Sequence, residues 1–98
     1  MRIIPNPAKE AVNVRKHKLD FASVEEVLTG ETVDYWDDRP LGYEHEGRVR
    51  LLGRLGQQVV VLVFEPVEGD GSEFGVRPVS LRRATRREAG DYWKVCGR

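Results

Sequence analysis

Four arginines within six positions are the residues of this chain whose type and spacing most clearly suggest chemistry. They lie in the segment VSLRRATRRE, residues 79–88, as Arg82, Arg83, Arg86 and Arg87. A guanidinium group binds phosphate oxygens in pairs and stays protonated at neutral pH. The same side chains are equally compatible with a solvated helix face whose charges pair with Glu88 or Asp91. Charge alone therefore leaves two interpretations, a phosphate site and an ordinary basic surface.

The formal net charge of zero conceals an uneven distribution. Residues 1–19 contain five basic residues and one acidic, residues 20–46 contain nine acidic and one basic, and residues 71–98 contain seven basic and three acidic. If the two basic ends meet in the fold, they form a local positive site, which matters more to an anionic ligand than the total charge. The alternative is that the acidic segment neutralises both ends by surface pairing.

Arg77 and Ser80 extend the candidate phosphate site towards the preceding strand. In a regular strand they point to opposite faces, unless Pro78, which removes a backbone donor, breaks the regularity. His17, beside Lys16 at the end of a predicted helix, is favoured there as a cation by the helix dipole. Histidine is also the usual general acid or base near neutral pH, although a helix-ending residue packed on the core is the plainer interpretation.

Several classes of protein are excluded or disfavoured. Ninety-eight residues allow one domain, residues 1–98. The single cysteine, Cys96, rules out an internal disulfide framework and favours a reducing compartment. Two histidines without close spacing argue against structural zinc, and neither a phosphate-cradling glycine loop nor a nucleophile elbow is present. With no signal-like or membrane-length apolar run, we expect a cytoplasmic protein.

The elements that must position these residues follow the order α-α-β-β-β-β-α. Helices are predicted over 6–18, begun by Asn6 as N-cap and Pro7, over 21–30, begun by Asp20, and over 82–95. Strands are predicted over 31–38, 47–55, 58–66 and 74–81, and the β-branched run of 58–66 indicates burial on both faces. Hairpin connections predict the α+β class: two N-terminal helices, a four-stranded antiparallel sheet with helices on one side, and a C-terminal helix.

Three segments together resemble one protein family. The first, NPAKEAVNVRKHKLDF, is similar to D-P-x-K-x-x-x-N-x-x-K-H-G-[VI]-x-F; the second, EGRVRLLGR, to E-x-R-φ-x-x-[IL]-G; and the third, VRPVSLRRATRRE, to I-R-I-I-S-A-R-x-A-[TS]-x-x-E. The matching residues are Pro7, Lys9, Asn13, Lys16, His17, Phe21, Glu46, Arg48, Gly53, Arg77, Ser80, Arg82, Ala84, Thr85 and Glu88. Three weak patterns in order and at the right spacing make the chain resemble the BrnT family of ribonuclease toxins.

The resemblance implies a RelE-like fold and metal-independent cleavage of RNA that inhibits translation and growth, with no cofactor. It also implies a BrnA-type antitoxin with a ribbon-helix-helix region, through which alone the toxin reaches operator DNA. The roles that follow are phosphate stabilisation by Arg77 and Arg82, proton transfer by one or more of a second set, and binding of flanking phosphates by a third. The second set is His17, Lys16, Glu46 and Tyr92, and the third is Ser80, Arg83 and Arg86.

Four positions depart from the family pattern. Asn6 replaces aspartate, Lys18 replaces a glycine that readily takes positive φ, Pro78 replaces a strand aliphatic residue, and Leu81 replaces alanine. Two rival hypotheses accordingly stand beside the toxin: an RNA-binding domain without catalysis, and a module that only docks a protein. Aromatic residues around Trp36 and on the last helix are a candidate antitoxin surface.

Overall fold

The structure, a computed structural model, describes residues 2–34, 47–68 and 74–97 and confirms the predicted α+β class. In chain order the elements are β1 (Arg2–Ile3), α1 (Pro7–His17), the 3₁₀ helix η1 (Phe21–Ser23), α2 (Val24–Thr29), β2 (Val33–Asp34), β3 (Val49–Leu55), β4 (Gln58–Glu68), β5 (Phe74–Arg83) and α3 (Arg86–Cys96). In the described part of the chain, no helix is both long and apolar enough to cross a membrane.

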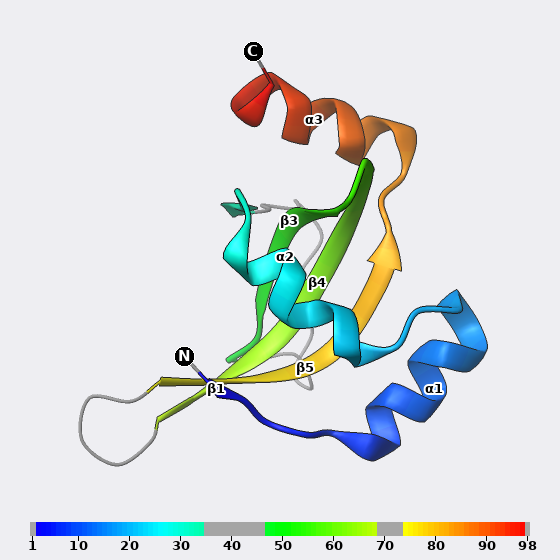
Figure 1. The fold of residues 1–98 in the computed structure, drawn as a ribbon, viewed down its shortest axis with the longest axis vertical. Coiled ribbons are helices and arrows are strands. Elements are labelled where there is room, and N and C mark those ends of the chain that lie inside the picture. Colours follow the sequence, from blue (N-terminus) through cyan, green and yellow to red (C-terminus); the bar gives the residue numbers. More distant parts are fainter. Residues whose placement is uncertain (1, 35–46, 69–73, 98) are drawn as a thin grey trace.

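A single sheet of five strands, in the order β1-β5-β4-β3-β2, forms the centre of the molecule (Figure 1). Strands β2 to β5 pair antiparallel, as predicted, but β1 runs parallel to β5 through Arg2 opposite Gly75 and Ile3 opposite Val76. The prediction of four purely antiparallel strands was therefore wrong. Strand β1 is only two residues long, too short for alternation of apolar and polar residues to reveal it.

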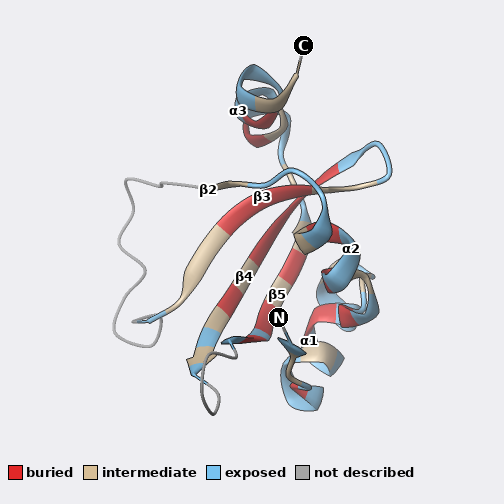
Figure 2. Cartoon of the chain, turned by 60° about the vertical axis from the view of Figure 1, so that its left-hand side comes forward, coloured by how far each residue is buried: buried red, intermediate tan, exposed pale blue. Residues whose placement is uncertain are grey.

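Residues of α2 and of α3 pack on opposite faces of the sheet, which corrects the prediction that the helices lie on one side. Helix α3 lies near the upper end of the strands, apart from α1 and α2 (Figure 2). On the first face, η1 and α2 cover the larger core, made of Phe21, Val24, Val27, Leu51, Val60, Leu62, Phe64, Val76 and Leu81, while α1 lies against β5. On the second face, Tyr92 of α3 packs on a smaller cluster of Leu52, Val59 and Val61. Because β4 is apolar on both faces, a sheet with helices on one side only would leave half of it exposed.

The boundary between β5 and α3 also differs from the prediction. Strand β5 continues through Arg83, and α3 begins only at Arg86, after Thr85 as N-cap. Thr85 Oγ1 accepts a hydrogen bond from the Glu88 amide, and the Glu88 carboxylate accepts one from the Thr85 amide. This capping box was visible in the sequence as Thr-x-x-Glu. Arg82 and Arg83 are consequently strand residues that point to opposite faces, not members of a helical stripe.

The two N-terminal helices were placed correctly, but one of their caps was not. Asp20 accepts a hydrogen bond from the Ala22 amide at 3.1 Å, as predicted. The Asn6 side chain makes no cap hydrogen bond at the start of α1 and instead donates to the Pro78 carbonyl at 2.8 Å. The strand predicted over 31–38 is described only as β2, so Trp36 lies outside the described residues.

Candidate functional site

A β-bulge in β5 decides which candidate residues share a face. Ser80 pairs with Val63 of β4, whereas Pro78 pairs with Phe64, so Val79 is an extra residue between them. Pro78 thus marks the break in regularity that the sequence suggested, at a position where proline has no amide hydrogen for the ladder.

The extra residue brings Arg77, Ser80 and Arg82 to the same face of the sheet. Their partners on β4 are Glu65, Val63 and Val61, which are spaced by two along that strand. Residues spaced by two in a strand share a face, and directly paired residues across strands share it too. Val61 packs with Tyr92 in the smaller cluster, so this is the second face, the one that carries α3.

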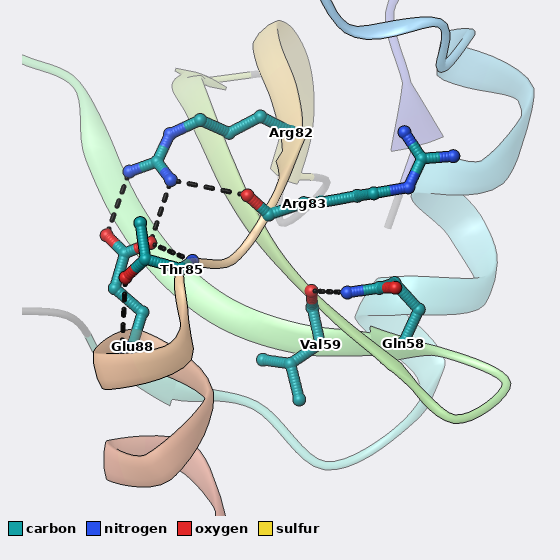
Figure 3. A network of polar contacts seen from close by, with 6 residues as sticks. All are labelled: Gln58, Val59, Arg82, Arg83, Thr85 and Glu88. Atoms are coloured by element: carbon teal, nitrogen blue, oxygen red, sulfur yellow. Dashed lines mark hydrogen bonds and ion pairs between the residues drawn. The ribbon is translucent and has the colours of Figure 1, made fainter.

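Arg82 is held there by the N-terminal turn of α3. Its Nη1 and Nη2 donate to the two carboxylate oxygens of Glu88 at 2.8 and 2.9 Å (Figure 3). The Glu88 side chain is 7% exposed and that of Arg82 is 29% exposed. Because Glu88 also caps α3 through the Thr85 amide, one carboxylate fixes both the helix start and the direction of the guanidinium.

Arg83 points to the opposite side of β5 (Figure 3). It pairs with Val60, which belongs to the first face, and its Nη1 donates to the backbone carbonyl of His17 at 3.1 Å. The last carbonyls of a helix have no partner within the helix and carry partial negative charge. Arg83 therefore binds the C-terminal end of α1 and links that end to β5.

Two asparagines attach α1 to the outer edge of β5. Asn13, which is 3% exposed, accepts from the Leu81 amide at 2.8 Å and donates to the Leu81 carbonyl at 2.7 Å. It also donates to the Leu19 carbonyl at 2.8 Å, while Asn6 holds the Pro78 carbonyl farther along the strand. The Asn13 amide thus satisfies the two backbone groups that a further strand would have satisfied. The sequence pattern contained Asn13, but only the structure supplies its role.

His17 stands at the end of α1 that these contacts place beside β5. Partial burial lowers its pKa below the ordinary 6.5, and the positive charges of Lys16 and Arg82 lower it further. The expectation that the helix C-terminus would favour the histidine cation is therefore wrong in direction, because desolvation and two cations oppose the dipole. A neutral imidazole at pH 7 is suited to accept a proton.

The residue after His17, where the family pattern has glycine, adopts the left-handed conformation. Lys18 has φ 61° and ψ 27°, and its amide donates to the Val14 carbonyl, which closes α1. A lysine at positive φ carries a steric cost that glycine avoids. Lys18 is therefore a strained substitution rather than a different turn.

The remaining candidates do not join this site equally. Lys16 is exposed on the last turn of α1 and Arg86 is exposed at the start of α3. Tyr92 is fully buried, its hydroxyl donates to the Glu31 carbonyl at 2.9 Å, and burial raises its pKa. Its contacts join α3 to the segment before β2. Glu46 lies outside the described residues.

Three residues of the second face were not among the residues predicted from the sequence. Glu88 was weighed only as a general partner for arginines, because its pairing with Arg82 depends on where α3 begins. Arg50 and Arg54 of β3 share the face through their pairing with Val63 and Val59. Arg54 also stacks on Trp93 of α3, its Cζ 5.3 Å from the ring centroid. The register that joins this face of β3 to β5 through β4 is not visible in the sequence.

The geometry unites a basic sheet face with a neutral histidine at its edge. Arginines that are fixed before a ligand arrives can stabilise charge developing on a phosphate, and the imidazole can take a proton. Within residues 2–34, 47–68 and 74–97, no group of three or more His, Cys, Asp and Glu side chains is placed to hold a metal ion.

Comparison with known proteins assigns the family. A comparison with curated proteins gave no match. Residues 6–88 match the family model described as the ribonuclease toxin BrnT of type II toxin–antitoxin systems. The match includes α1, the bulged strand β5 and Glu88, which together hold Arg77, Arg82 and His17. The chain belongs to the BrnT family of ribonuclease toxins.

Proposed function

We propose that this protein is an endoribonuclease that cleaves RNA without a metal ion and so inhibits translation and growth until an antitoxin binds it. The observation that carries the proposal is the bulge at Val79, which gathers Arg77, Ser80 and Arg82 on one sheet face within a ribonuclease toxin family. Preorganised cations and hydrogen-bond donors of this kind can stabilise the charge that develops on a phosphodiester under attack.

In the proposed reaction the ribose 2′ oxygen attacks the adjacent phosphorus. A bond forms between these two atoms, the bond from phosphorus to the 5′ oxygen breaks, and the products are a 2′,3′-cyclic phosphate and a 5′ hydroxyl. Negative charge accumulates on the pentacoordinate phosphate, and in this scheme Arg77 and Arg82 stabilise it. Arg82 is the better oriented of the two because Glu88 fixes its guanidinium.

Proton transfer is assigned to the end of α1. His17 accepts the proton of the 2′ hydroxyl, since its lowered pKa keeps it neutral at pH 7. The ammonium of the neighbouring Lys16 is the donor to the leaving 5′ oxygen. Ser80 and Arg86 bind flanking phosphates, whereas Arg83, which points to the other side of β5, is assigned to holding the end of α1 through the His17 carbonyl. Tyr92 serves packing in this scheme, because its buried hydroxyl already donates to a backbone carbonyl, and Glu46 stays a candidate from the sequence alone.

Cleavage of a labelled RNA in the presence of a chelator tests the proposal. Arg77→Ala and Arg82→Ala should each lower the cleavage rate about 10²–10³-fold, the usual effect of removing a preorganised group that stabilises transition-state charge. Arg15→Ala is the matched control, because Arg15 is exposed and lies about 200° around α1 from Asn13, which faces β5. Its rate should equal that of the wild type.

Each rival hypothesis predicts a different result in the same assay. A folded wild-type protein that binds RNA but never produces cyclic phosphate ends would be an RNA-binding domain without catalysis. One that neither binds nor cuts RNA, yet still docks a partner protein, would be an interaction module. Growth arrest on expression, abolished by Arg77→Ala, separates the toxin from both.

The family also implies a protein partner, the antitoxin. We propose a BrnA-like antitoxin with a ribbon-helix-helix region that contacts α3, where Trp93 is 38% and Val95 63% exposed. Co-purification with the product of a neighbouring reading frame tests this. Trp93→Ala together with Val95→Ala should weaken the complex at least tenfold, whereas an affinity equal to that of the wild type would assign the antitoxin to another surface.

A further inference from the structure

The second face of the sheet carries arginines from β3 as well as from β5. Arg50 of β3, Val63 of β4 and Ser80 of β5 are directly paired and form one row across the sheet. The next row towards α3 is Leu52, Val61 and Arg82, and on the other side Arg77 pairs with Glu65. Arg50, Arg77 and Arg82 therefore surround the small side chains of Val63 and Ser80.

The middle of this triangle is an accessible floor. Leu52, Val59 and Val61 are buried beneath Tyr92, but Arg50, Val63 and Ser80 are only half-buried and Arg77 is exposed. Neighbouring strands lie about 4.8 Å apart, so the backbones of Arg50 and Ser80 are roughly 10 Å from each other. A few linked nucleotides span that distance.

Among the residues that the structure describes, basic side chains outnumber acidic ones on this face. Among the described residues that the strand register places there, Glu65 is the one acid, against Arg50, Arg54, Arg77 and Arg82. The carboxylate of Glu88 reaches the face from α3, where Arg82 binds it. A surface of separated cations around a small apolar floor suits a flexible polyanion, whose phosphates meet the cations while its bases rest on the floor.

We infer that Arg50 is a further phosphate-binding residue and that single-stranded RNA crosses the sheet from β5 to β3. This inference rests on the proposed ribonuclease function. The scissile phosphate lies at Arg77 and Arg82, and Arg50 binds a phosphate a few nucleotides away. Arg50 contributes to substrate binding without taking part in the chemical step. It occupies a variable position of the middle family pattern, two residues after Arg48, so this contact is a property of the present chain.

Salt-dependent binding measures the contact directly. A single-stranded RNA made uncleavable by 2′-O-methyl groups is titrated with the protein at several salt concentrations, with fluorescence anisotropy as the readout. Removing one phosphate contact lowers the slope of log affinity against log salt by about 0.7 for a single strand. We expect that loss for Arg50→Ala and a wild-type slope for Arg15→Ala, while Arg50→Lys, which keeps the charge, should restore most of the slope. Urea denaturation of each variant ensures that folded proteins are compared.

Substrate length provides an independent arm. Trimming the uncleavable RNA from either end should reach a length at which wild type and Arg50→Ala bind equally, while Arg77→Ala still binds more weakly. Wild-type slope and affinity for folded Arg50→Ala, with Arg77→Ala still impaired in cleavage, would overturn the inference and leave the proposed function standing. Tighter binding of duplex RNA than of single strands would overturn the single-strand path. A wild-type protein that neither binds nor cuts RNA would overturn both proposals.

Discussion

The two sides of strand β5 make different kinds of contact. On the side of α1, backbone groups of the strand are bound by buried asparagine amides, and Leu81 packs in the larger apolar core. On the side of α3, Arg77 and Arg82 stand beside Ser80 on a partly exposed surface, and one ion pair is the main polar link to the helix. The ten residues of β5 thus supply buried contacts that stabilise the fold on one side and basic side chains for phosphate on the other.

This difference predicts that substitutions on one side chiefly change stability, whereas substitutions of exposed arginines on the other chiefly change activity. A change on the α1 side removes buried hydrogen bonds, so its first effect is on the free energy of unfolding. On the α3 side, Arg77→Ala removes charge from an exposed side chain, so its first effect is on phosphate binding and cleavage. Family membership alone does not make this distinction, because both Asn13 and Arg82 match the family pattern.

Asn13→Ala tests the structural side and carries the largest expected effect on stability. The amide and carbonyl of Leu81 would lose their partners in a buried place, and each such loss costs about 1–3 kcal/mol. We expect the free energy of unfolding in urea to fall by about 3 kcal/mol.

Two variants frame that result. Arg15→Ala, on the outer side of α1, should change the free energy of unfolding by no more than about 0.5 kcal/mol. Arg77→Ala should be as stable as Arg15→Ala yet lose cleavage. A stable Asn13→Ala, or an Arg77→Ala that unfolds, would erase the proposed division between the two sides.

Glu88→Gln tests the link between α3 and Arg82. Glutamine can still serve in a capping box, but it removes the negative charge that Arg82 binds through two hydrogen bonds. We expect a loss of about 1–2 kcal/mol in stability and a roughly tenfold slower cleavage, since the guanidinium loses its fixed orientation. Urea denaturation and single-turnover cleavage provide the two numbers. A faster enzyme would mean that Glu88 competes with phosphate for Arg82.

The sequence predicted those parts of the fold that local pattern determines. The β-branched run of β4 and the Asp20 cap belong to this group, since each depends on residues within one short segment. Strand β1 was missed because two residues carry no periodicity, and α3 on the second face because no local pattern says which side of a sheet a helix will cover.

The candidate site was only partly predictable for the same reason. Arg77, Ser80 and Arg82 were found by type and by family pattern, yet their common face depends on a bulge that adds one residue to β5. Pro78 suggested an irregularity without giving its register. Arg50 reaches the site through strand pairing between distant segments, which leaves no signal in composition or spacing. Glu88 is only six residues from Arg82, but their ion pair depends on α3 beginning at Arg86 and not at Arg82.

The pH dependence of cleavage tests the role of His17, at the end of α1 beside β5. His17 is neutral above its lowered pKa, so the acid limb of wild-type cleavage should lie below pH 6.5. Lys16→Met removes the proposed proton donor, so it lowers the cleavage rate at every pH. It should also move the acid limb of the remaining activity to higher pH, because the cation of His17 is then opposed by one neighbour fewer. The same shift should appear in the NMR titration of His17, which is independent of catalysis. Arg15→Met is the control and should leave both curves in place.

The free energy of unfolding should also depend on pH through His17. Because the folded state lowers the pKa of His17, the unfolded chain binds more protons near pH 6, and this contribution to stability is lost as pH falls below 6.5. Lys16→Met should reduce that loss. If Lys16→Met left both the acid limb and the NMR titration of His17 unchanged, His17 would not be part of the basic site.

Lys18→Gly carries the smallest expected effect and tests whether the turn that ends α1 is strained. Lys18 adopts φ 61°, where a side chain costs about 1–2 kcal/mol that glycine does not pay. Part of this gain is offset by the greater freedom of glycine in the unfolded chain and by loss of the hydrogen bond from Lys18 Nζ to the Arg15 carbonyl at 3.2 Å. We therefore expect thermal unfolding to show a net stabilisation of about 0.5–1 kcal/mol.

Lys16→Gly removes the same charge two residues earlier, inside α1, and should destabilise the protein by about 1 kcal/mol. Opposite signs for two identical substitutions would assign the effect to backbone conformation, because loss of a lysine charge is common to both. Equal signs would assign it to charge and would contradict the strained turn at Lys18. In the first case the glycine of the family pattern is explained by the turn that ends α1 and brings His17 to β5, with no direct role in RNA chemistry.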